Sequence, residues 1–331
     1  MIIDAHAHLV SPDSLYAYRS MLLANGGYHF GRPRISDDAL AETAAGNVAI
    51  MDSVGTDLQL LSPRPFVLGH SMQPSRMLEP WIRANNETIA RTIGLHPTRF
   101  AGVGALPLSP DEPVSAGFGE LDRLVDEGFV GVLINPDLHE GRGATPTLGD
   151  RYWYPLWERI VERDLPIHIH SAGCYSDRET YSEHFVTEES IAILAMLRSS
   201  VFTDFPTLRV MISHGGGSVP YQVGRWQAEA LHPGLGGRPD AERFETSLRR
   251  FWFDTVLHYP PSLELLLRLV GPDRVLFGTE KPGSGSAPDP ETGRDLDDLK
   301  PVIEGFDFLT DRDRQAVFED NARTVFPGLK S

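Results

Sequence analysis

The sequence predicts a (β/α)8 barrel, the TIM-barrel fold class, that occupies residues 1–331 as a single domain. Eight short apolar runs alternate with amphipathic stretches, which is the order of elements in such a barrel. The length of 331 residues suits eight strand–helix units. Polar side chains also gather where the apolar runs end, and barrels of this class place their chemistry at the carboxyl ends of their strands.

The predicted strands are short runs rich in β-branched, aromatic and other apolar residues. In order they cover residues 2–8, 57–62, 100–107, 129–136, 165–173, 208–217, 250–256 and 274–280. Between them, apolar residues recur with the period of a helix. The predicted helices cover residues 39–53, 77–93, 116–127, 154–163, 188–200 and 261–270.

Two segments interrupt the repeat, and each follows a predicted strand. Residues 10–38 are rich in Tyr, Gly and Arg, and residues 281–297 read KPGSGSAPDPETGRDLD, with the Pro and Gly of an irregular loop. We expect both insertions to lie over the mouth of the barrel as a lid or to form a contact between subunits.

Composition restricts the class of protein. The chain is 41% hydrophobic and 23% charged, and its formal net charge of −16 argues against a nucleic-acid partner. No apolar run reaches the roughly 18 residues of a membrane helix, and the N-terminus has no signal-peptide pattern. We therefore expect a cytoplasmic protein without a membrane partner. The one cysteine, Cys174, excludes a cysteine-based metal site, so any metal ligands are His and carboxylate side chains.

Histidines and a carboxylate at three strand ends predict a metal site. His6 and His8 lie two apart on the first strand, so both imidazoles face one point. His168 and His170 share a face of the fifth strand, and His170, which is nearer the mouth, is the predicted ligand, with His168 packed deeper. Glu280 ends the eighth strand. This donor set suits Zn²⁺, with Mn²⁺ as the alternative.

Other polar residues at the strand ends are candidates for chemistry and substrate binding. His214 follows the sixth strand and is predicted to be an acid/base group. Arg64 follows the second strand and is predicted to hold the carboxylate of a small anionic substrate, the alternative being a salt bridge to a loop acid. Weaker candidates for the same polar lining are Asn135, His184, Arg225 and Lys281.

Taken in order, the strand-end motifs resemble those of the amidohydrolase superfamily, in the branch related to aminocarboxymuconate-semialdehyde decarboxylase. The likeness covers nearly the whole chain through DAHAH, INPD, IHIHSAG, SHGGGSVPY, FDTV, LFGTE and NARTVFP. Most members of that branch carry aspartate where this chain has Glu280. By its glutamate at this position and by the segments LLSPRP and DRYWYPLWERI, this chain is similar to the 4-oxalomesaconate hydratases.

The resemblance implies a zinc-dependent lyase that adds water to a carbon–carbon double bond of a tricarboxylate in aromatic-acid catabolism. In this reading Glu280 binds the metal or takes the proton of the attacking water, His214 protonates the substrate, and Arg64, Asn135 and His184 bind it. A decarboxylase of an aromatic or muconate-type acid and a hydrolase of a lactone or amide stay open as alternatives. The resemblance also implies a homo-oligomer such as a dimer, and Cys174 is expected to be a structural thiol.

Overall fold

Eight parallel strands form the centre of the computed structural model, which describes residues 1–28 and 31–329. Each strand pairs with the next in chain order. Two backbone hydrogen bonds of 2.8 Å, from Ala5 to Phe277 and from Glu280 to His6, join the first strand to the segment after the eighth. The (β/α)8 prediction is confirmed. The strands are β1 (Ile3–His8), β2 (Leu58–Ser62), β3 (Phe100–Ala105), β4 (Gly131–Ile134), β5 (Ile167–Ile169), β6 (Val210–Ile212), β7 (Trp252–Asp254) and β8 (Val275–Leu276).

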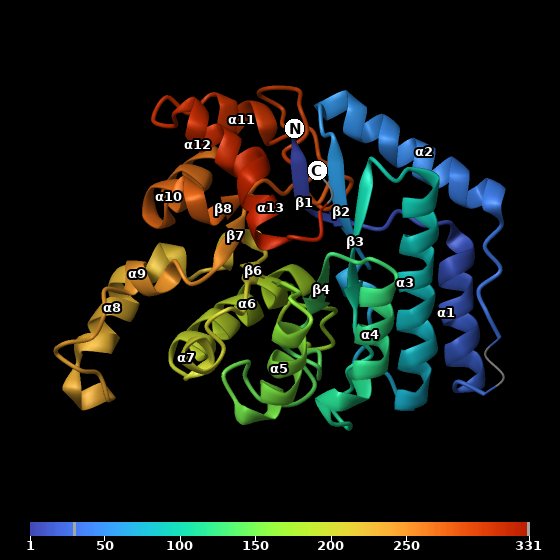
Figure 1. Cartoon of the computed structure of the whole chain (residues 1–331), viewed down its shortest axis with the longest axis horizontal. Coiled ribbons are helices and arrows are strands. Elements are labelled where there is room, and N and C mark those ends of the chain that lie inside the picture. The colour runs from blue at the N-terminus through green and yellow to red at the C-terminus, as the bar shows by residue number, and fades with distance from the viewer. Residues whose placement is uncertain (29–30, 330–331) are drawn as a thin grey trace.

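Helices surround these strands (Figure 1). Their apolar faces meet the outside of the barrel, where Trp81, Trp153 and Trp157 are fully buried. The helices are α1 (Asp13–Asn25), α2 (Asp37–Val54), α3 (Leu78–Leu95), α4 (Phe118–Asp126), α5 (Tyr154–Glu162), α6 (Tyr181–Leu197), α7 (Val201–Asp204), α8 (Val223–Leu231), α9 (Phe244–Leu248), α10 (Pro260–Val270), α11 (Lys300–Glu304), α12 (Asp311–Gln315) and α13 (Asn321–Val325).

Helix α6 begins earlier in the chain than the predicted helix at 188–200. Thr180 and Glu183 form a capping box, in which the Thr180 hydroxyl accepts from the Glu183 N–H and the Glu183 carboxylate accepts from the Thr180 N–H. The first turns of α6 therefore carry His184 and Phe185, which are both buried.

The last four strands are shorter than the apolar runs that predict them. Where a strand ends, side chains form hydrogen bonds with backbone groups that no longer pair with a neighbouring strand. The Thr255 hydroxyl accepts from the Gly278 N–H at 3.0 Å and donates to the Gly278 carbonyl at 2.7 Å. Asp254 accepts from the N–H of Gly215 at 2.9 Å. This arrangement frees the strand ends for polar side chains that face the mouth.

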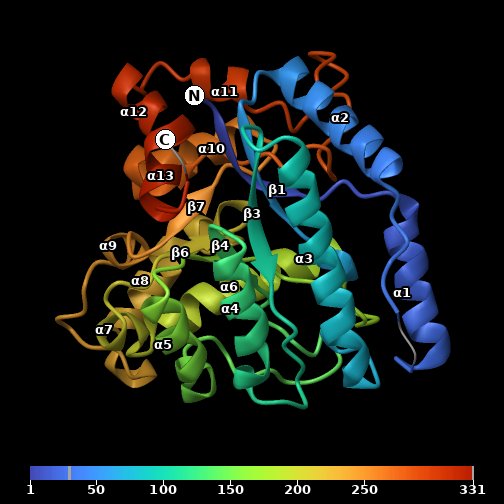
Figure 2. The ribbon, with the colours of Figure 1, turned by 45° about the vertical axis from the view of Figure 1, so that its right-hand side comes forward.

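The insertion at 10–38 contains helix α1, which lies beside α3 on the outside of the barrel (Figure 2). Leu15, Tyr18 and Leu22 are its buried residues. No described residue of α1 lines the cavity above the strand ends, and the expected lid or subunit contact stays a prediction. Residues 29 and 30 of this insertion lie outside the described residues.

The second insertion does reach the mouth. Gly283 and Ser284 line the cavity above the strand ends. Lys281 holds the loop in place, because its ammonium group contacts Asp295 at 2.6 Å and Asp297 at 2.7 Å. Lys281 thus has a structural role in this loop, and its charge is already compensated.

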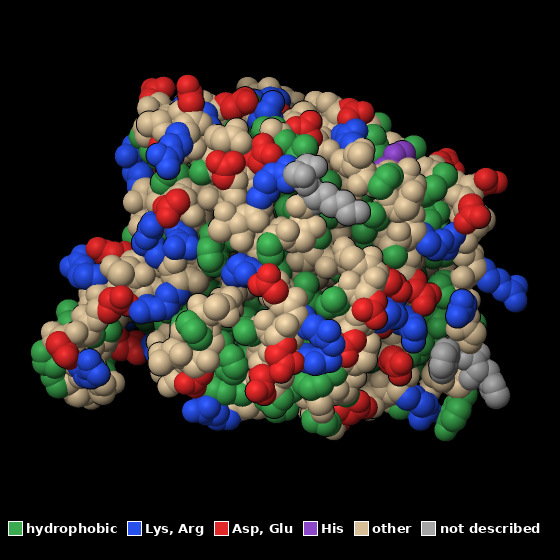
Figure 3. Space-filling model, in the orientation of Figure 1, with side chains coloured by type: hydrophobic (Ala, Val, Ile, Leu, Met, Phe, Trp, Pro, Cys, Tyr) green, Lys and Arg blue, Asp and Glu red, His purple; other side chains and the backbone are tan. Residues whose placement is uncertain are grey.

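On the face drawn in Figure 3, basic and acidic side chains are interspersed. Among the helices that the structure describes, none combines the length and the apolar character needed to cross a membrane.

Candidate active site

Four side chains predicted as metal ligands meet at the mouth of the barrel. The ligand atoms of His6, His8, His170 and Glu280 all lie within 4.8 Å of one another. Nε2 of His8 is 3.3 Å from Nε2 of His6 and 3.1 Å from Oε1 of Glu280. Nε2 of His170 is 3.5 Å from the same oxygen. The structure thus brings together atoms from β1 and from the ends of β5 and β8.

A second interaction orients each imidazole. Nδ1 of His6 lies 2.6 Å from Oδ2 of Asp254, and Nδ1 of His8 lies 2.8 Å from the Ser62 hydroxyl. Nδ1 of His170 donates to the carbonyl of Ser171 at 2.6 Å. All three rings therefore turn Nε2 toward the common centre, as metal-binding histidines do when their other nitrogen is held.

The donor set fits a divalent metal ion. Nε2 of His170 is buried and has no hydrogen-bond partner among the described residues, although an unpaired polar atom is costly in such a place. Burial lowers the pKa of His6 well below its ordinary value and that of His8 to about 4, so both rings are neutral, as ligation requires. Three imidazoles and one carboxylate suit Zn²⁺ or Mn²⁺.

Glu280 is presented by a strained turn. Its φ of 59° lies in the left-handed region, where glutamate is uncommon. Its N–H donates to the His6 carbonyl at 2.8 Å, which fixes the backbone against β1. Burial raises the pKa of Glu280, but the contacts of its carboxylate with the surrounding imidazoles lower it well below its ordinary value. Glu280 is therefore an anion at neutral pH.

His214 lies beside the four candidate ligands. Its Nε2 is 3.7 Å from Oε1 of Glu280, and its Nδ1 is 2.9 Å from Oε1 and 3.0 Å from Oε2 of Glu189. Burial lowers the pKa of His214, but the charge and hydrogen bond of Glu189, followed by those of Glu280, raise it well above its ordinary value. His214 is thus protonated at neutral pH and directs an N–H into the site.

A cavity of about 500 Å³ opens above this cluster. Arg64 lines it and is half-buried. The guanidinium donates to the Pro282 carbonyl at 3.4 Å and forms no ion pair within residues 1–28 and 31–329. The charge of Arg64 is therefore available to an anion in the cavity. The other walls are largely apolar and aromatic, and include Phe66, Phe185, Val256 and Leu257.

This geometry is accompanied by a match along the sequence. A family model described as "Amidohydrolase" matches residues 3–328. The chain belongs to the amidohydrolase family. The resemblance that the strand-end motifs indicated is thereby confirmed.

Individual relatives in this family include hydratases and decarboxylases. A 2-keto-4-carboxy-3-hexenedioate hydratase from Sphingobium sp. strain SYK-6 is 37% identical, and the match covers 99% of this chain and 97% of that protein. A gamma-resorcylate decarboxylase from Polaromonas sp. strain JS666 is 29% identical over 71% of this chain and 76% of its own length. The crystal structure of a 4-oxalomesaconate hydratase from Rhodopseudomonas palustris superposes with a TM-score of 0.86 at 32% identity, covering 99% of this chain and 96% of that one.

Two of the predicted substrate-binding residues lie elsewhere in this amidohydrolase. The Asn135 amide donates to the Asp137 carbonyl at 2.7 Å and accepts from the Asp137 N–H at 3.0 Å, so it holds the loop after β4. His184 lines a second cavity together with Asp137. Neither residue is among the described residues that line the central cavity. Their assignment to substrate binding therefore has no support from their positions.

Arg225 and Cys174 are also absent from the described residues that line the central cavity. Arg225 is exposed on α8. Cys174 is half-buried, and its Sγ lies 3.9 Å from Oε1 of Glu179. His168 is buried, and its Nε2 lies 2.8 Å from the Ser213 hydroxyl. Its ring lies edge-on to the His6 ring with centroids 4.8 Å apart, so His168 supports His6, as its predicted deeper position implies.

Sequence reasoning missed Glu189, His258 and the role of Asp254. Asp254 ends β7, and its strand-end position was a usable signal. Glu189 lies on α6, away from any strand end, and no spacing rule connects it to His214.

His258 lines the cavity, and its buried Nδ1 has no hydrogen-bond partner in the part of the chain that the structure describes. A Cβ at Gly285 would collide with the His258 ring, so this glycine lets the loop after β8 pack on it.

Proposed function

We propose that this enzyme is a hydratase that adds water to a carbon–carbon double bond of an unsaturated keto polycarboxylate such as 4-oxalomesaconate. The observation that carries the proposal is the similarity to two hydratases over 99% of the chain. The glutamate at position 280, through which the sequence resembles the hydratases, agrees with it.

His6, His8, His170 and Glu280 would hold the metal ion of this reaction. Zn²⁺ is the proposed metal and Mn²⁺ the alternative, because both accept imidazole and carboxylate ligands. When bound, the ion supplies Lewis acidity toward water or toward an oxygen of the substrate.

Two protein groups would move the protons of hydration. The oxygen of water forms a bond to one alkene carbon while the water gives a proton to the anionic carboxylate of Glu280. His214 donates the proton on Nε2 to the other alkene carbon, and Glu189 stabilises the imidazolium before that transfer. The proton would then return from Glu280 to His214, and one bridging water or a small side-chain movement would close the 3.7 Å between Glu280 Oε1 and His214 Nε2.

Arg64 and His258 would bind and orient the substrate. The Arg64 guanidinium is the cation of the cavity wall without an acidic partner in the described chain, so it is suited to a substrate carboxylate. His258 has an unpaired nitrogen on the same cavity and offers a neutral hydrogen bond, because burial lowers its pKa.

A decarboxylase is the second candidate, because a relative that is 29% identical is a gamma-resorcylate decarboxylase. The same residues would then hold the metal, and His214 would protonate the carbon that loses carbon dioxide.

One assay distinguishes the two functions. Metal-loaded protein is mixed with 4-oxalomesaconate, and the loss of the conjugated ultraviolet absorbance is followed together with the mass of the product. A product heavier by one water supports the hydratase. Release of carbon dioxide supports the decarboxylase instead, and an unchanged substrate with metal bound would mean that another acid is the substrate.

A further inference from the structure

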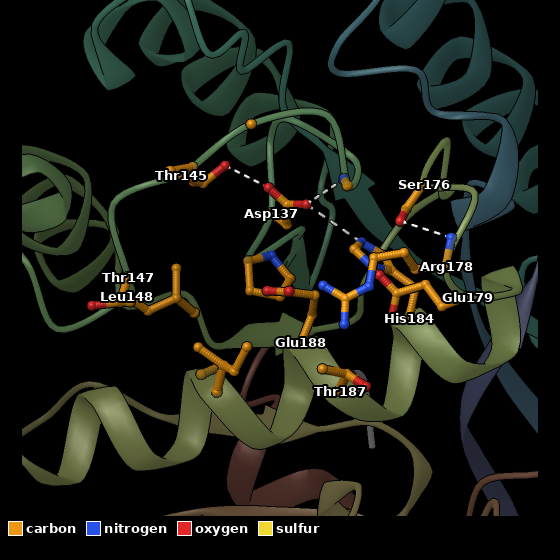
Figure 4. Close-up of a pocket in the computed structure, with 16 residues that line it drawn as sticks. Asp137, Thr145, Thr147, Leu148, Ser176, Arg178, Glu179, His184, Thr187 and Glu188 are labelled. Atoms are coloured by element: carbon orange, nitrogen blue, oxygen red, sulfur yellow. Dashed lines mark hydrogen bonds and ion pairs between the residues drawn. The ribbon is translucent and has the colours of Figure 1, made fainter.

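A second cavity of about 570 Å³ lies beside the barrel mouth, between the loop after β4, the segment 176–179 and helix α6 (Figure 4). Among the described residues, none lines both this cavity and the central one. Nothing in the proposed reaction uses it. Its walls nevertheless carry a cluster of groups of the kind that bind metal ions.

Asp137, His184 and Glu188 form this cluster. Their ligand atoms lie within 4.8 Å of one another. His184 and Glu188 are four residues apart on α6 and therefore share one face of the helix. Figure 4 shows Asp137 reaching them from the opposite wall. Two carboxylates and an imidazole from two elements are a suitable donor set for Mn²⁺ or Zn²⁺.

His184 is oriented like the ligands of the central site. Its Nδ1 lies 3.1 Å from Oε1 of Glu179, which holds the ring, and its Nε2 faces Asp137. The side chain is 2% exposed, and Nε2 has no hydrogen-bond partner within the described chain. Oδ2 of Asp137 lies 3.4 Å from Nε2, which is the distance of an ion pair, but the two atoms form no hydrogen bond. A buried and oriented imidazole nitrogen that faces a carboxylate without a hydrogen bond is the second indication of a ligand here.

The two carboxylates complete the site in different ways. Asp137 is rigid, because its oxygens accept from the N–H of His139 at 3.0 Å, the Thr145 hydroxyl at 2.6 Å and the N–H of Gly141 at 2.7 Å. A carboxylate offers about four lone-pair sites, so one remains for a cation. Glu188 is partly buried and accepts no hydrogen bond from any described residue. It is free to turn toward an ion.

We propose that Asp137, His184 and Glu188 bind a second divalent metal ion, with water from the open cavity completing its coordination. The ion would tie the loop after β4 to helix α6. That helix carries Phe185 and Glu189 of the central site immediately after His184 and Glu188, respectively. Binding in the second cavity would therefore fix the helix that positions His214.

The test counts ions without reference to turnover. Protein whose central site is filled with Zn²⁺ is titrated with Mn²⁺, and free Mn²⁺ is measured by its electron paramagnetic resonance signal. Wild-type protein is expected to bind one Mn²⁺ per chain while keeping its zinc. Glu188→Gln should abolish this binding, whereas Glu158→Gln, at an exposed position on α5, should leave it unchanged. Thermal melting checks that both variants fold.

A second measurement identifies the ligand. Spin-echo modulation of bound Mn²⁺ should show coupling to one imidazole nitrogen, and His184→Gln should remove it. The proposal is overturned if wild-type protein binds no Mn²⁺ beyond its zinc, or if Glu188→Gln binds as much as wild type. A normal echo signal in His184→Gln would likewise overturn it. None of these outcomes depends on whether the protein hydrates 4-oxalomesaconate.

Discussion

The buried carboxylate of Glu189 holds Nδ1 of His214 with its two oxygens at 2.9 and 3.0 Å. Helix α6 thus supplies the partner of an imidazole that follows β6. This contact fixes which nitrogen of His214 faces the cavity and stabilises its charged form.

Glu189→Gln is expected to lower kcat by about 100-fold, because His214 loses the anion that keeps it protonated. The metal content should stay the same, since Glu189 touches none of the four candidate ligands. Steady-state kinetics and metal analysis by mass spectrometry check both points, with the exposed Glu158→Gln as the control. A rise in KM alone would show that Glu189 acts on substrate binding instead.

Glu280→Gln is expected to keep the fold and to lower kcat by more than about 100-fold, because the amide is neither an anionic ligand nor a base. Circular dichroism tests the fold, and the hydration assay tests the rate. Metal content then separates the two roles of Glu280. Loss of metal indicates a ligand, and retained metal with lost turnover indicates a base. Turnover at the wild-type rate would contradict both.

Arg64→Ala is expected to raise KM by about 10- to 100-fold, the effect of losing one hydrogen-bonded charge pair with a substrate carboxylate. Arg64→Lys keeps the charge but cannot form the two-pronged contact, so its KM should lie between those of wild type and Arg64→Ala. Arg238→Ala, at a residue whose side chain is 74% exposed, serves as the control. Unchanged KM and kcat/KM in Arg64→Ala would leave Arg64 with a structural role.

The free energy of unfolding of metal-free protein should fall as the pH rises, because Glu188 and His184 in the second cavity lose protons. Burial, followed by the charge of Asp137, raises the pKa of Glu188 from 4.5 to about 7. Burial lowers the pKa of His184, but Asp137 and Glu179 raise it above its ordinary value. Both groups bind protons more tightly in the folded state, so their contribution is full at low pH and falls as the pH rises through these values.

Urea unfolding of metal-free protein at about pH 5 and about pH 8 measures this effect. Asp137, Glu179 and Arg178 are the other charged groups on the cavity wall, and they stay unchanged in Glu188→Gln. That variant should show a smaller loss of unfolding free energy over this range than wild type or Glu158→Gln. Equal losses in all three proteins would contradict the assignment to Glu188.

The sequence was most informative where one element determines the geometry. His6 and His8 could be paired because side chains two apart on a strand share a face. The strand ends could be combined because parallel strands in a barrel share one mouth. The same reasoning gave His170 and Glu280 their places, and the structure has all four together.

Contacts between different elements could not be read from spacing. The distance from Glu189 to His214 depends on how α6 packs against the turn at His214–Gly216, and no periodicity encodes it. The start of α6 was predictable in principle, since TYSE at 180–183 is a capping-box sequence. Helix α1 was also predictable in principle, because Leu15, Tyr18 and Leu22 have helical spacing in the segment 10–38, for which only an insertion was predicted.

Because β1 pairs with the segment after β8, the candidate metal site can form only late in the synthesis of the chain. His8 and Glu280 are 272 residues apart in sequence, yet their ligand atoms are 3.1 Å apart. A nascent chain therefore exposes two of its histidines almost at once but lacks the anionic ligand until residue 280 has left the ribosome. High-affinity metal capture would thus accompany completion of the barrel, and a chain truncated before residue 280 would have neither a closed sheet nor a full set of ligands.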